Sequence, residues 1–395
     1  MAEKREPRTV SRRAETARDA LAAAGRILVL AKFRFMGDTI VATPFLGQLR
    51  GQFPNALISL LASPSAATAL AGCPHVDAIL SLETAGVSRW RHSRELLDLL
   101  RQGDYDAVFL LNRSFHCAVT SAQAGIPVRI GYATDLRRPF LTLPVPYSFD
   151  RHEVECHLDM LRALGLPAQP QLPELWISEE ERRPMAARLT ELGWPENRPL
   201  IGVQPGSNDA AIREWGAERY AWVADRLVEE TGGSVILMGG AAERPTAARM
   251  VEAMRHPALN LAGELRLREA LAAIGLCDLW LGNDTGLLHA AVAQRVASVG
   301  LFGPNKVLRW GYATPRHRSL VVIPDRPARD DTTVRRCLDA IPPETALEAA
   351  RAVLRHPKRQ PEEAAYAAPA PDPAAARSPY FDATLAPALA PVRRR

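Results

Sequence analysis

Residues 26–54 read RILVLAKFRFMGDTIVATPFLGQLRGQFP, and this stretch decides the fold class. Its first six residues (RILVLA) form a short apolar run that is typical of a buried β-strand. After a short loop, apolar residues recur at the spacing of one helix face: Val41, Phe45, Leu49 and Phe53. Pro44 lies inside this helical pattern and argues against one straight helix. A strand followed by a helix predicts a βα unit of an α/β fold.

The same alternation continues along the chain. In the first half, strand-like runs occur at residues 57–62, 76–82, 107–111 and 128–130. In the second half they occur at residues 200–204, 234–238, 279–282 and 297–302, with helical patterns at 217–231 and 267–276. The pattern predicts two doubly wound parallel sheets, each covered by helices on both faces. No GxGxxG motif follows the first strand, where a dinucleotide-binding fold would need it.

A chain of 395 residues is too long for one compact core, so two domains are expected. The predicted segments are a flexible or loosely helical arm (1–24), a first Rossmann-like domain (25–175), a proline-rich linker with a helix around 179–192 (176–198), a second Rossmann-like domain (199–340), a C-terminal helix (341–358) and a disordered tail (359–395). The Ala/Pro-rich composition of the tail cannot bury enough apolar surface to order it.

The formal net charge of +5 resides at the two ends of the chain. Residues 1–25 hold six Lys/Arg and four Asp/Glu, and residues 355–395 hold seven and four. The body between them is therefore neutral, which is a poor footprint for nucleic acid. The basic ends weakly favour contact with an anionic membrane surface, although solvated tails are the simpler interpretation.

Other bulk features indicate a cytoplasmic protein. No apolar run approaches the ~20 residues that a membrane span needs. The N-terminus lacks the apolar core of a secretory signal. Five scattered cysteines without a CxxC pair argue against a disulfide framework or a zinc site. We therefore predict a cytoplasmic location, with peripheral contact at the inner membrane as an option.

Ligands of open α/β sheets bind beyond the carboxyl ends of the strands, so the loops that leave the strands are candidate sites. The first such loop, residues 32–39 (KFRFMGDT), contains Asp38 where the strand gives way to a helix. A carboxylate held there can take a proton from an acceptor hydroxyl. A helix-capping aspartate is an equally good interpretation of the residue alone.

Two loops of the second half carry groups that suit a nucleotide. Residues 205–208 (PGSN), followed by Arg213, offer backbone N–H groups and a positive charge to a phosphate. Residues 239–243 (GGAAE) let a ligand approach the backbone, and Glu243 can accept hydrogen bonds from ribose hydroxyls. A polar surface loop and a helix-starting glutamate are the structural alternatives.

The most informative loop is residues 283–289 (NDTGLLH), which opens an apolar helix. The backbone amides and the positive end of the helix dipole are suited to a diphosphate. His289 lies four residues after Thr285, so both occupy one helix face. Lys306, in the loop after the next strand, can add a positive charge. A helix cap with a packed histidine and an exposed lysine is the alternative interpretation.

In these segments the sequence resembles glycosyltransferase family 9, the ADP-heptose:lipopolysaccharide heptosyltransferases. The matching segments follow the family's order: MGDTIVATPFLGQLRGQFP, PGS…REW, LMGGAAE, NLAGELRLREALAAIGLCDLWLGNDTGLLHAAVA and LFGPN. The resemblance implies a GT-B type fold, with two Rossmann-like domains facing across a cleft. It also implies inverting transfer without a metal or cofactor, from ADP-heptose to a lipopolysaccharide-core or related glycolipid acceptor.

The resemblance also implies roles for particular residues. Asp38 of the GD motif would be the general base, with Lys32, Arg34 and Gly37 on the acceptor side. The implied nucleotide-sugar contacts are Ser207, Arg213, Glu243, Asp284, Thr285, Gly286, His289 and Lys306. Arg213 stands where a lysine is common, and Arg34 stands where small serines are frequent. Two alternatives stay open: a nucleotide-sugar epimerase of the same architecture and a non-catalytic nucleotide-sugar-binding protein.

Overall fold

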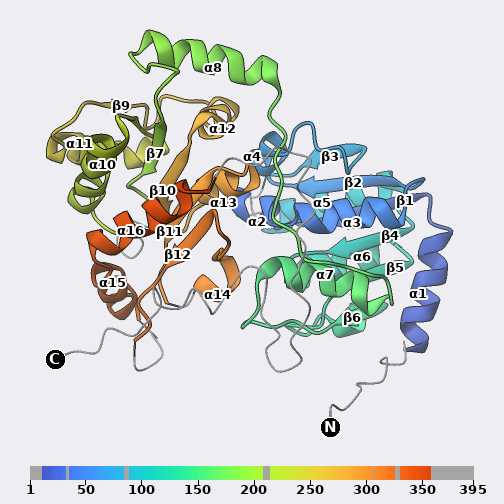
Figure 1. Cartoon of the computed structure of the whole chain (residues 1–395). Helices are drawn as coiled ribbons and strands as arrows, with labels where there is room; N and C mark the ends of the chain where they lie inside the picture. Colours follow the sequence, from blue (N-terminus) through green and yellow to red (C-terminus); the bar gives the residue numbers. More distant parts are fainter. Residues whose placement is uncertain are drawn as a thin grey trace. The chain divides into compact units, whose positions relative to one another are not determined.

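The computed structural model describes residues 11–32, 35–83, 89–207, 214–304, 306–324 and 330–356 (Figure 1). The chain divides into two compact units. The first unit comprises Met1–Phe149 and Glu153–Pro170, and the second comprises Asp150–His152 and Gln171–Arg395. The sequence predicts this boundary a few residues later, after residue 175.

The first unit is an α/β structure built on a parallel sheet in the order β3-β2-β1-β4-β5-β6. Its strands are β1 (Arg26–Leu30), β2 (Leu57–Ala62), β3 (Ala78–Ser81), β4 (Ala107–Leu110), β5 (Val128–Tyr132) and β6 (Leu143–Val145). Its helices are α1 (Arg12–Ala22), α2 (Met36–Ile40), α3 (Thr43–Gln52), α4 (Pro64–Ala69), α5 (Arg89–Gly103), α6 (Phe115–Gln123), η1 (Arg138–Phe140) and α7 (Glu153–Ala163).

The second unit repeats this plan with a parallel sheet in the order β12-β11-β10-β7-β8-β9. Its strands are β7 (Leu200–Gln204), β8 (Ser234–Leu237), β9 (Ala258–Asn260), β10 (Leu279–Asn283), β11 (Ala297–Leu301) and β12 (His317–Leu320). Its helices are α8 (Glu179–Glu191), α10 (Ala217–Thr231), η2 (Ala241–Glu243), α11 (Arg244–Ala253), α12 (Leu267–Leu276), α13 (Gly286–Ala293), α14 (Val307–Trp310), α15 (Asp331–Asp339) and α16 (Pro343–Leu354).

Both sheets reverse their strand order at the same point, so the predicted fold class is confirmed. The reversal lies between β1 and β4 in the first unit, and between β7 and β10 in the second. Such a topological switch point leaves a crevice beyond the carboxyl ends of the two strands, and ligands of doubly wound folds bind there. The loops after these four strands are therefore the places to look for a site.

The helix expected after β1 consists of two helices, α2 and α3, with a break at residues 41–42. Pro44 lies in the first turn of α3. The first N–H groups of a helix have no intrahelical acceptor, so a proline there costs no hydrogen bond. The break thus follows from the residue that argued against a single straight helix.

The N-terminal segment expected as a flexible arm contains the helix α1. Its buried residues Ala14, Ala17 and Leu21 recur at the spacing of one helix face. The side chain of Ser11 accepts a hydrogen bond from the Ala14 N–H and caps the helix. Residues 1–10 and the predicted disordered tail lie outside the described residues.

The segment expected as a linker contains α8, which packs on α12 of the second unit. The carboxylate of Glu181, in the first turn of α8, accepts a hydrogen bond of 2.6 Å from the Nε of Arg268 on α12. This bonding holds the pKa of Glu181 well below its ordinary value, at about 2. Residues 176–198 therefore contribute a helix to the second unit as well as connecting chain.

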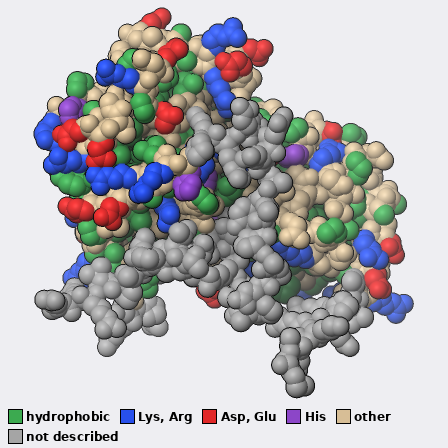
Figure 2. Space-filling model, viewed as in Figure 1, with side chains coloured by type: hydrophobic (Ala, Val, Ile, Leu, Met, Phe, Trp, Pro, Cys, Tyr) green, Lys and Arg blue, Asp and Glu red, His purple; other side chains and the backbone are tan. Residues whose placement is uncertain are grey.

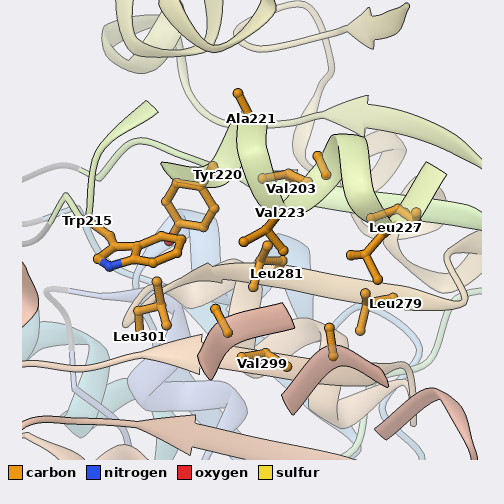
Figure 3. Packing of buried hydrophobic residues seen from close by; sticks show 14 of the residues in the cluster. Val203, Trp215, Tyr220, Ala221, Val223, Leu227, Leu279, Leu281, Val299 and Leu301 are labelled. Atoms are coloured by element: carbon orange, nitrogen blue, oxygen red, sulfur yellow. The ribbon is translucent and has the colours of Figure 1, made fainter. Parts of the chain in front are cut away.

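The core of the second unit shows how its sequence makes a covered sheet (Figure 3). Alternate residues of the strands, such as Leu279 and Leu281 of β10, point to one face of the sheet. Tyr220, Val223 and Leu227 recur at helical spacing on α10 and pack against that face. The core fixes the strand ends from which the site loops depart.

The distribution of charged side chains on the surface agrees with the expectation that the body of the chain carries no net charge. Figure 2 shows Lys and Arg side chains lying beside Asp and Glu side chains on the visible face. All five cysteines are buried as thiols. Among the described residues, no helix combines the length and apolarity needed to cross a bilayer.

Candidate active site

Asn283 joins the two strand ends at the switch point of the second unit. Its side chain is fully buried at the end of β10. The amide nitrogen donates to the carbonyl oxygens of Pro205 and Gly206, at 3.1 and 3.2 Å, in the loop after β7. The amide oxygen accepts from the Tyr220 hydroxyl at 2.9 Å and from the Trp215 N–H at 3.3 Å. The loop after β7 is thus tied to the start of the NDTGLLH segment.

Replacing Asn283 by Ala should lower the free energy of unfolding by about 2–4 kcal/mol, because it leaves several buried polar groups without a partner. The measurement is urea denaturation of the purified variant beside the parent chain. A matched control is Asn260→Ala, at the end of the edge strand β9, where the side-chain oxygen accepts a hydrogen bond of 3.2 Å from the Ala262 N–H. Equal losses in the two variants would contradict a pinning role for Asn283.

A chain of hydrogen bonds links the loops after β7, β8 and β10. The Thr285 hydroxyl donates to the side-chain oxygen of Gln204, the last residue of β7. The amide nitrogen of Gln204 donates to Glu243 Oε1 at 2.9 Å. Glu243 Oε2 accepts from the Gly240 N–H. The structure therefore brings together Thr285 and Glu243, two predicted site residues that belong to separate sequence motifs.

Glu243 is held in a tight, buried setting by the glycines of the neighbouring loops. A Cβ on Gly206 would lie 2.8 Å from the Glu243 Cβ, and a Cβ on Gly239 would lie 2.8 Å from Glu243 Oε2. Only glycine at these two positions lets the carboxylate sit so close to both backbones. Burial raises the pKa of Glu243 above its ordinary value, while the Gly240 N–H and the Gln204 amide oppose that rise.

His289 is a buried, neutral histidine on α13. Burial lowers its pKa to about 4. Its Nδ1 lies 2.8 Å from the Tyr312 hydroxyl, which fixes the ring. The Nε2 lies 4.0 Å from Asp284 Oδ1, a separation too long for a hydrogen bond. Because the imidazole is neutral near pH 7, Asp284 is a polar neighbour of His289 and does not form an ion pair with it.

Low pH should destabilise the fold through its buried histidines. Burial holds the pKa of His289 at about 4 and that of His317 at about 3, against an ordinary value of 6.5. Between these values the unfolded chain binds protons that the folded chain does not. Each histidine therefore removes about 1.4 kcal/mol of stability per pH unit as the pH falls below 6.5.

The check is urea unfolding of the parent chain and of His317→Asn at neutral pH and near pH 5. In the variant, the free energy of unfolding should fall less steeply as the pH is lowered, by about 1.4 kcal/mol per pH unit. The same pH dependence of unfolding in the two proteins would contradict a lowered pKa for His317 in the folded chain.

Of the other predicted nucleotide-side residues, Ser207 follows β7, Gly286 follows β10 and Lys306 follows β11. Ser207 is buried, and its N–H donates to Glu214 Oε1 at 3.3 Å. Gly286 begins α13, and Thr285 is the residue before its first turn. Lys306 is half-buried and stands directly before α14. Arg213 falls outside the described residues.

In the first unit, Asp38 belongs to the short helix α2 that follows β1. The residue that caps α2 is Phe35, so Asp38 is in the first turn and is not the N-cap that the alternative interpretation required. Its carboxylate is 14% exposed and lies 3.7 Å from the Nζ of Lys32. Gly37 is buried next to it. Arg34 falls outside the described residues.

Asn112 in the first unit corresponds to Asn283 in the second, because its side chain also links two strand ends at the switch point. It follows β4 and is buried. Its amide nitrogen donates to the carbonyl oxygen of Ala31 at 3.1 Å, at the end of β1. Its amide oxygen accepts from the Ser114 N–H at 3.0 Å. At both switch points an asparagine thus links the ends of the two adjacent parallel strands.

Sequence reasoning missed Gln204, Asn112 and the structural role of Asn283. The available signal was positional, because each is a polar residue at the carboxyl end of a buried strand beside a switch point. Among the described residues, no group of three His, Cys, Asp or Glu side chains is placed to hold a metal ion.

Comparisons with known proteins agree with this geometry. The model of glycosyltransferase family 9 (heptosyltransferase) matches residues 93–337. Lipopolysaccharide heptosyltransferase 2 of Escherichia coli strain K12 is 28% identical over 294 residues, which is 71% of this chain and 83% of that protein. Lipooligosaccharide heptosyltransferase 2 of Haemophilus ducreyi is 26% identical over 306 residues, or 73% of this chain and 86% of that protein.

Solved structures give the same result for the fold. The glycosyl transferase family 9 protein from Veillonella parvula is 25% identical with a TM-score of 0.76, covering 84% of this chain and 97% of that one. The E. coli ADP-heptose lps heptosyltransferase II is 25% identical with a TM-score of 0.67, covering 84% and 98%. The family model spans more than half of the chain. The chain therefore belongs to glycosyltransferase family 9, and it is a glycosyltransferase.

Proposed function

We propose that this glycosyltransferase moves a heptose from ADP-heptose onto a lipopolysaccharide-core or related glycolipid acceptor. The support is the family membership together with the names of its relatives, which are heptosyltransferases of lipopolysaccharide or lipooligosaccharide. The observation that carries the proposal is the bonded chain from Thr285 through Gln204 to Glu243 at the β7/β10 switch point.

We assign the nucleotide sugar to the second unit. Glu243 would accept hydrogen bonds from the ribose hydroxyls, since each carboxylate oxygen has a further lone pair beyond its present bond. The backbone N–H groups of Thr285, which caps α13, and of Gly286, its first residue, would donate to the diphosphate. Ser207, Asp284, His289, Lys306 and Arg213 complete the proposed set.

We assign the acceptor to the first unit, with Asp38 as the general base. The acceptor hydroxyl gives its proton to the Asp38 carboxylate, and its oxygen attacks the anomeric carbon of the heptose. The bond from that carbon to the diphosphate oxygen breaks, and ADP departs with the electron pair. Attack on the face opposite the leaving group inverts the anomeric configuration. Lys32, Arg34 and Gly37 flank the base in this assignment.

Negative charge builds on the departing diphosphate, and groups that are already oriented toward it lower the barrier. A single well-placed donor of this kind contributes about 3 kcal/mol. The positive end of α13 and the side chain of Lys306 would supply that stabilisation in the present chain.

We further propose that no metal takes part, because an ammonium group and helix amides can neutralise the leaving diphosphate by themselves. Saturating EDTA should then leave the initial rate unchanged. A loss of rate that Mg²⁺ restores would contradict this part of the proposal.

We also propose that the reaction takes place on the cytoplasmic face of the inner membrane, where the glycolipid acceptor would be presented.

The donor assignment is tested by isothermal titration of the purified chain with ADP, UDP and GDP. ADP should bind at least about 10-fold more tightly than the other two, the equivalent of one specific hydrogen-bond interaction. Tighter binding of UDP or GDP would overturn ADP-heptose as the donor. Turnover of the nucleotide sugar without an acceptor would favour an epimerase instead.

A further inference from the structure

A buried carboxylate in the first unit has no part in the proposed reaction so far. Glu153, in the first turn of α7, has a fully buried side chain. Its Oε1 accepts a hydrogen bond of 2.6 Å from the Nζ of Lys32, in the loop after β1. Its Oε2 accepts one of 2.7 Å from the hydroxyl of Tyr147, in the loop after β6. Both carboxylate oxygens are therefore bonded to side chains from distant loops.

Tyr147 is itself held in place by its neighbours. Its ring packs edge-on against Tyr132 of β5, with centroids 4.7 Å apart. The guanidinium of Arg113 lies 4.8 Å from the centroid of the same ring. The Tyr132 hydroxyl lies 2.7 Å from the Nδ1 of His157, on the same helix as Glu153. The position of the Glu153 carboxylate is thus fixed from several sides.

The ammonium of Lys32 is shared unequally between two carboxylates. It lies 2.6 Å from Glu153 and 3.7 Å from Asp38. The longer separation exceeds hydrogen-bond distance, so the direct bond goes to Glu153. A largely buried ammonium needs a bonded counter-ion, because desolvation of an unpaired charge costs several kcal/mol. If Glu153 lost its charge, the ammonium would be drawn more strongly toward the Asp38 carboxylate, which lies 3.7 Å from it.

A direct bond from the Lys32 ammonium to Asp38 would make Asp38 a poorer general base. A carboxylate that accepts a hydrogen bond from an ammonium holds its charged form more strongly and takes up a proton less readily. Its oxygen would also be occupied where a substrate hydroxyl has to approach. Keeping the ammonium on a second carboxylate avoids both effects and leaves the positive charge close by.

We propose that Glu153 is a positioning residue for the transfer reaction: it retains the Lys32 ammonium and so limits the hold of that ammonium on the Asp38 carboxylate, the proposed base. This inference rests on the proposed function, in which Asp38 is the base. Glu153 acts through Lys32 and does not touch the substrate.

The test begins with Glu153→Gln, which keeps the shape of the side chain and removes its charge. The kcat should fall roughly 10-fold or more, a part of the roughly 10²–10⁴-fold that a positioned base contributes. The KM for the nucleotide sugar should not change, because the donor is bound elsewhere. Adding Lys32→Met to this variant removes the ammonium that would capture Asp38, so the double variant should be faster than Glu153→Gln alone.

A purely structural role for Glu153 predicts the opposite order, with the double variant no faster than the single one. Glu155→Gln is the matched control on the same helix, because Glu155 is also buried and pairs with Arg162 at 2.6 Å. It should keep the parent kcat. If Glu153→Gln does not fold, Glu153→Asp provides the comparison, since its shortened carboxylate loosens the bond to Lys32 and Lys32→Met should again raise the rate.

Asp38→Asn is assayed beside these variants to separate the two claims. If Asp38→Asn keeps the parent rate, the proposed base is wrong. If Asp38→Asn is inactive while Glu153→Gln keeps the parent kcat, or while Lys32→Met fails to raise the rate of the Glu153 variant, the positioning role alone is overturned.

Discussion

Asp38→Asn should nearly abolish glycosyl transfer, with kcat lowered roughly 10²–10⁴-fold, the range that a positioned general base contributes. The asparagine has almost the same shape but cannot take the proton of the acceptor hydroxyl. ADP should bind with unchanged affinity, because the proposed nucleotide contacts are residues of the second unit. Steady-state kinetics measure kcat, and isothermal titration calorimetry measures the affinity for ADP.

Asp106→Asn is a suitable control for this experiment. Asp106 also belongs to the first unit, but its carboxylate accepts from the N–H groups of Gly25 and Arg26 at the amino end of β1, at 2.9 and 2.8 Å. Its replacement should cost stability and leave kcat unchanged. A parent-like kcat in Asp38→Asn would remove Asp38 from the mechanism, and a loss of ADP affinity would contradict the assignment of substrates to the two units.

Gly286→Pro should lower kcat/KM roughly 10²–10³-fold, the effect of deleting one preorganised donor to a developing negative charge. Gly286 is the first residue of α13, where proline fits the helix and removes only the backbone N–H. The preceding Thr285 has extended dihedral angles, φ −139° and ψ 169°, which a following proline favours. The substitution therefore deletes one amide without breaking the helix.

Gly286→Ala keeps the N–H and serves as the comparison. Both variants are assayed for transfer and for thermal unfolding. The proposal expects a loss in the proline variant that greatly exceeds the loss in the alanine variant, at similar melting temperatures. Comparable rates in the two variants would show that the α13 amide does not contribute to the reaction.

The fold was predictable from local patterns because its central strands are buried on both faces. Strands β2 and β7 and helices α10 and α12 match the predicted ranges residue for residue. The strands missed, β6, β9 and β12, are edge strands of three or four residues. Pro144 in β6 illustrates the reason, since an edge strand tolerates a proline that a central strand does not.

The candidate site was less predictable, since its contacts join residues far apart in sequence. The motifs located Asp38, Glu243 and Thr285, because each follows a strand. Nothing in the local sequence shows that Gln204 connects Thr285 to Glu243. Likewise, the bond from Lys32 to Glu153 spans 121 residues and depends on the order of the strands in the sheet. Such pairings follow from topology and not from composition or periodicity.

The central claim is acceptor-dependent transfer of heptose from ADP-heptose, and the most direct measurement follows both products in one reaction. The purified chain is incubated with ADP-heptose, with and without a lipopolysaccharide-core acceptor, and ADP and the glycosylated acceptor are quantified by mass spectrometry. We predict equal amounts of ADP and heptosylated acceptor, and neither product when the acceptor is left out. Conversion of ADP-heptose without the acceptor, or no heptosylated product in its presence, would contradict the account.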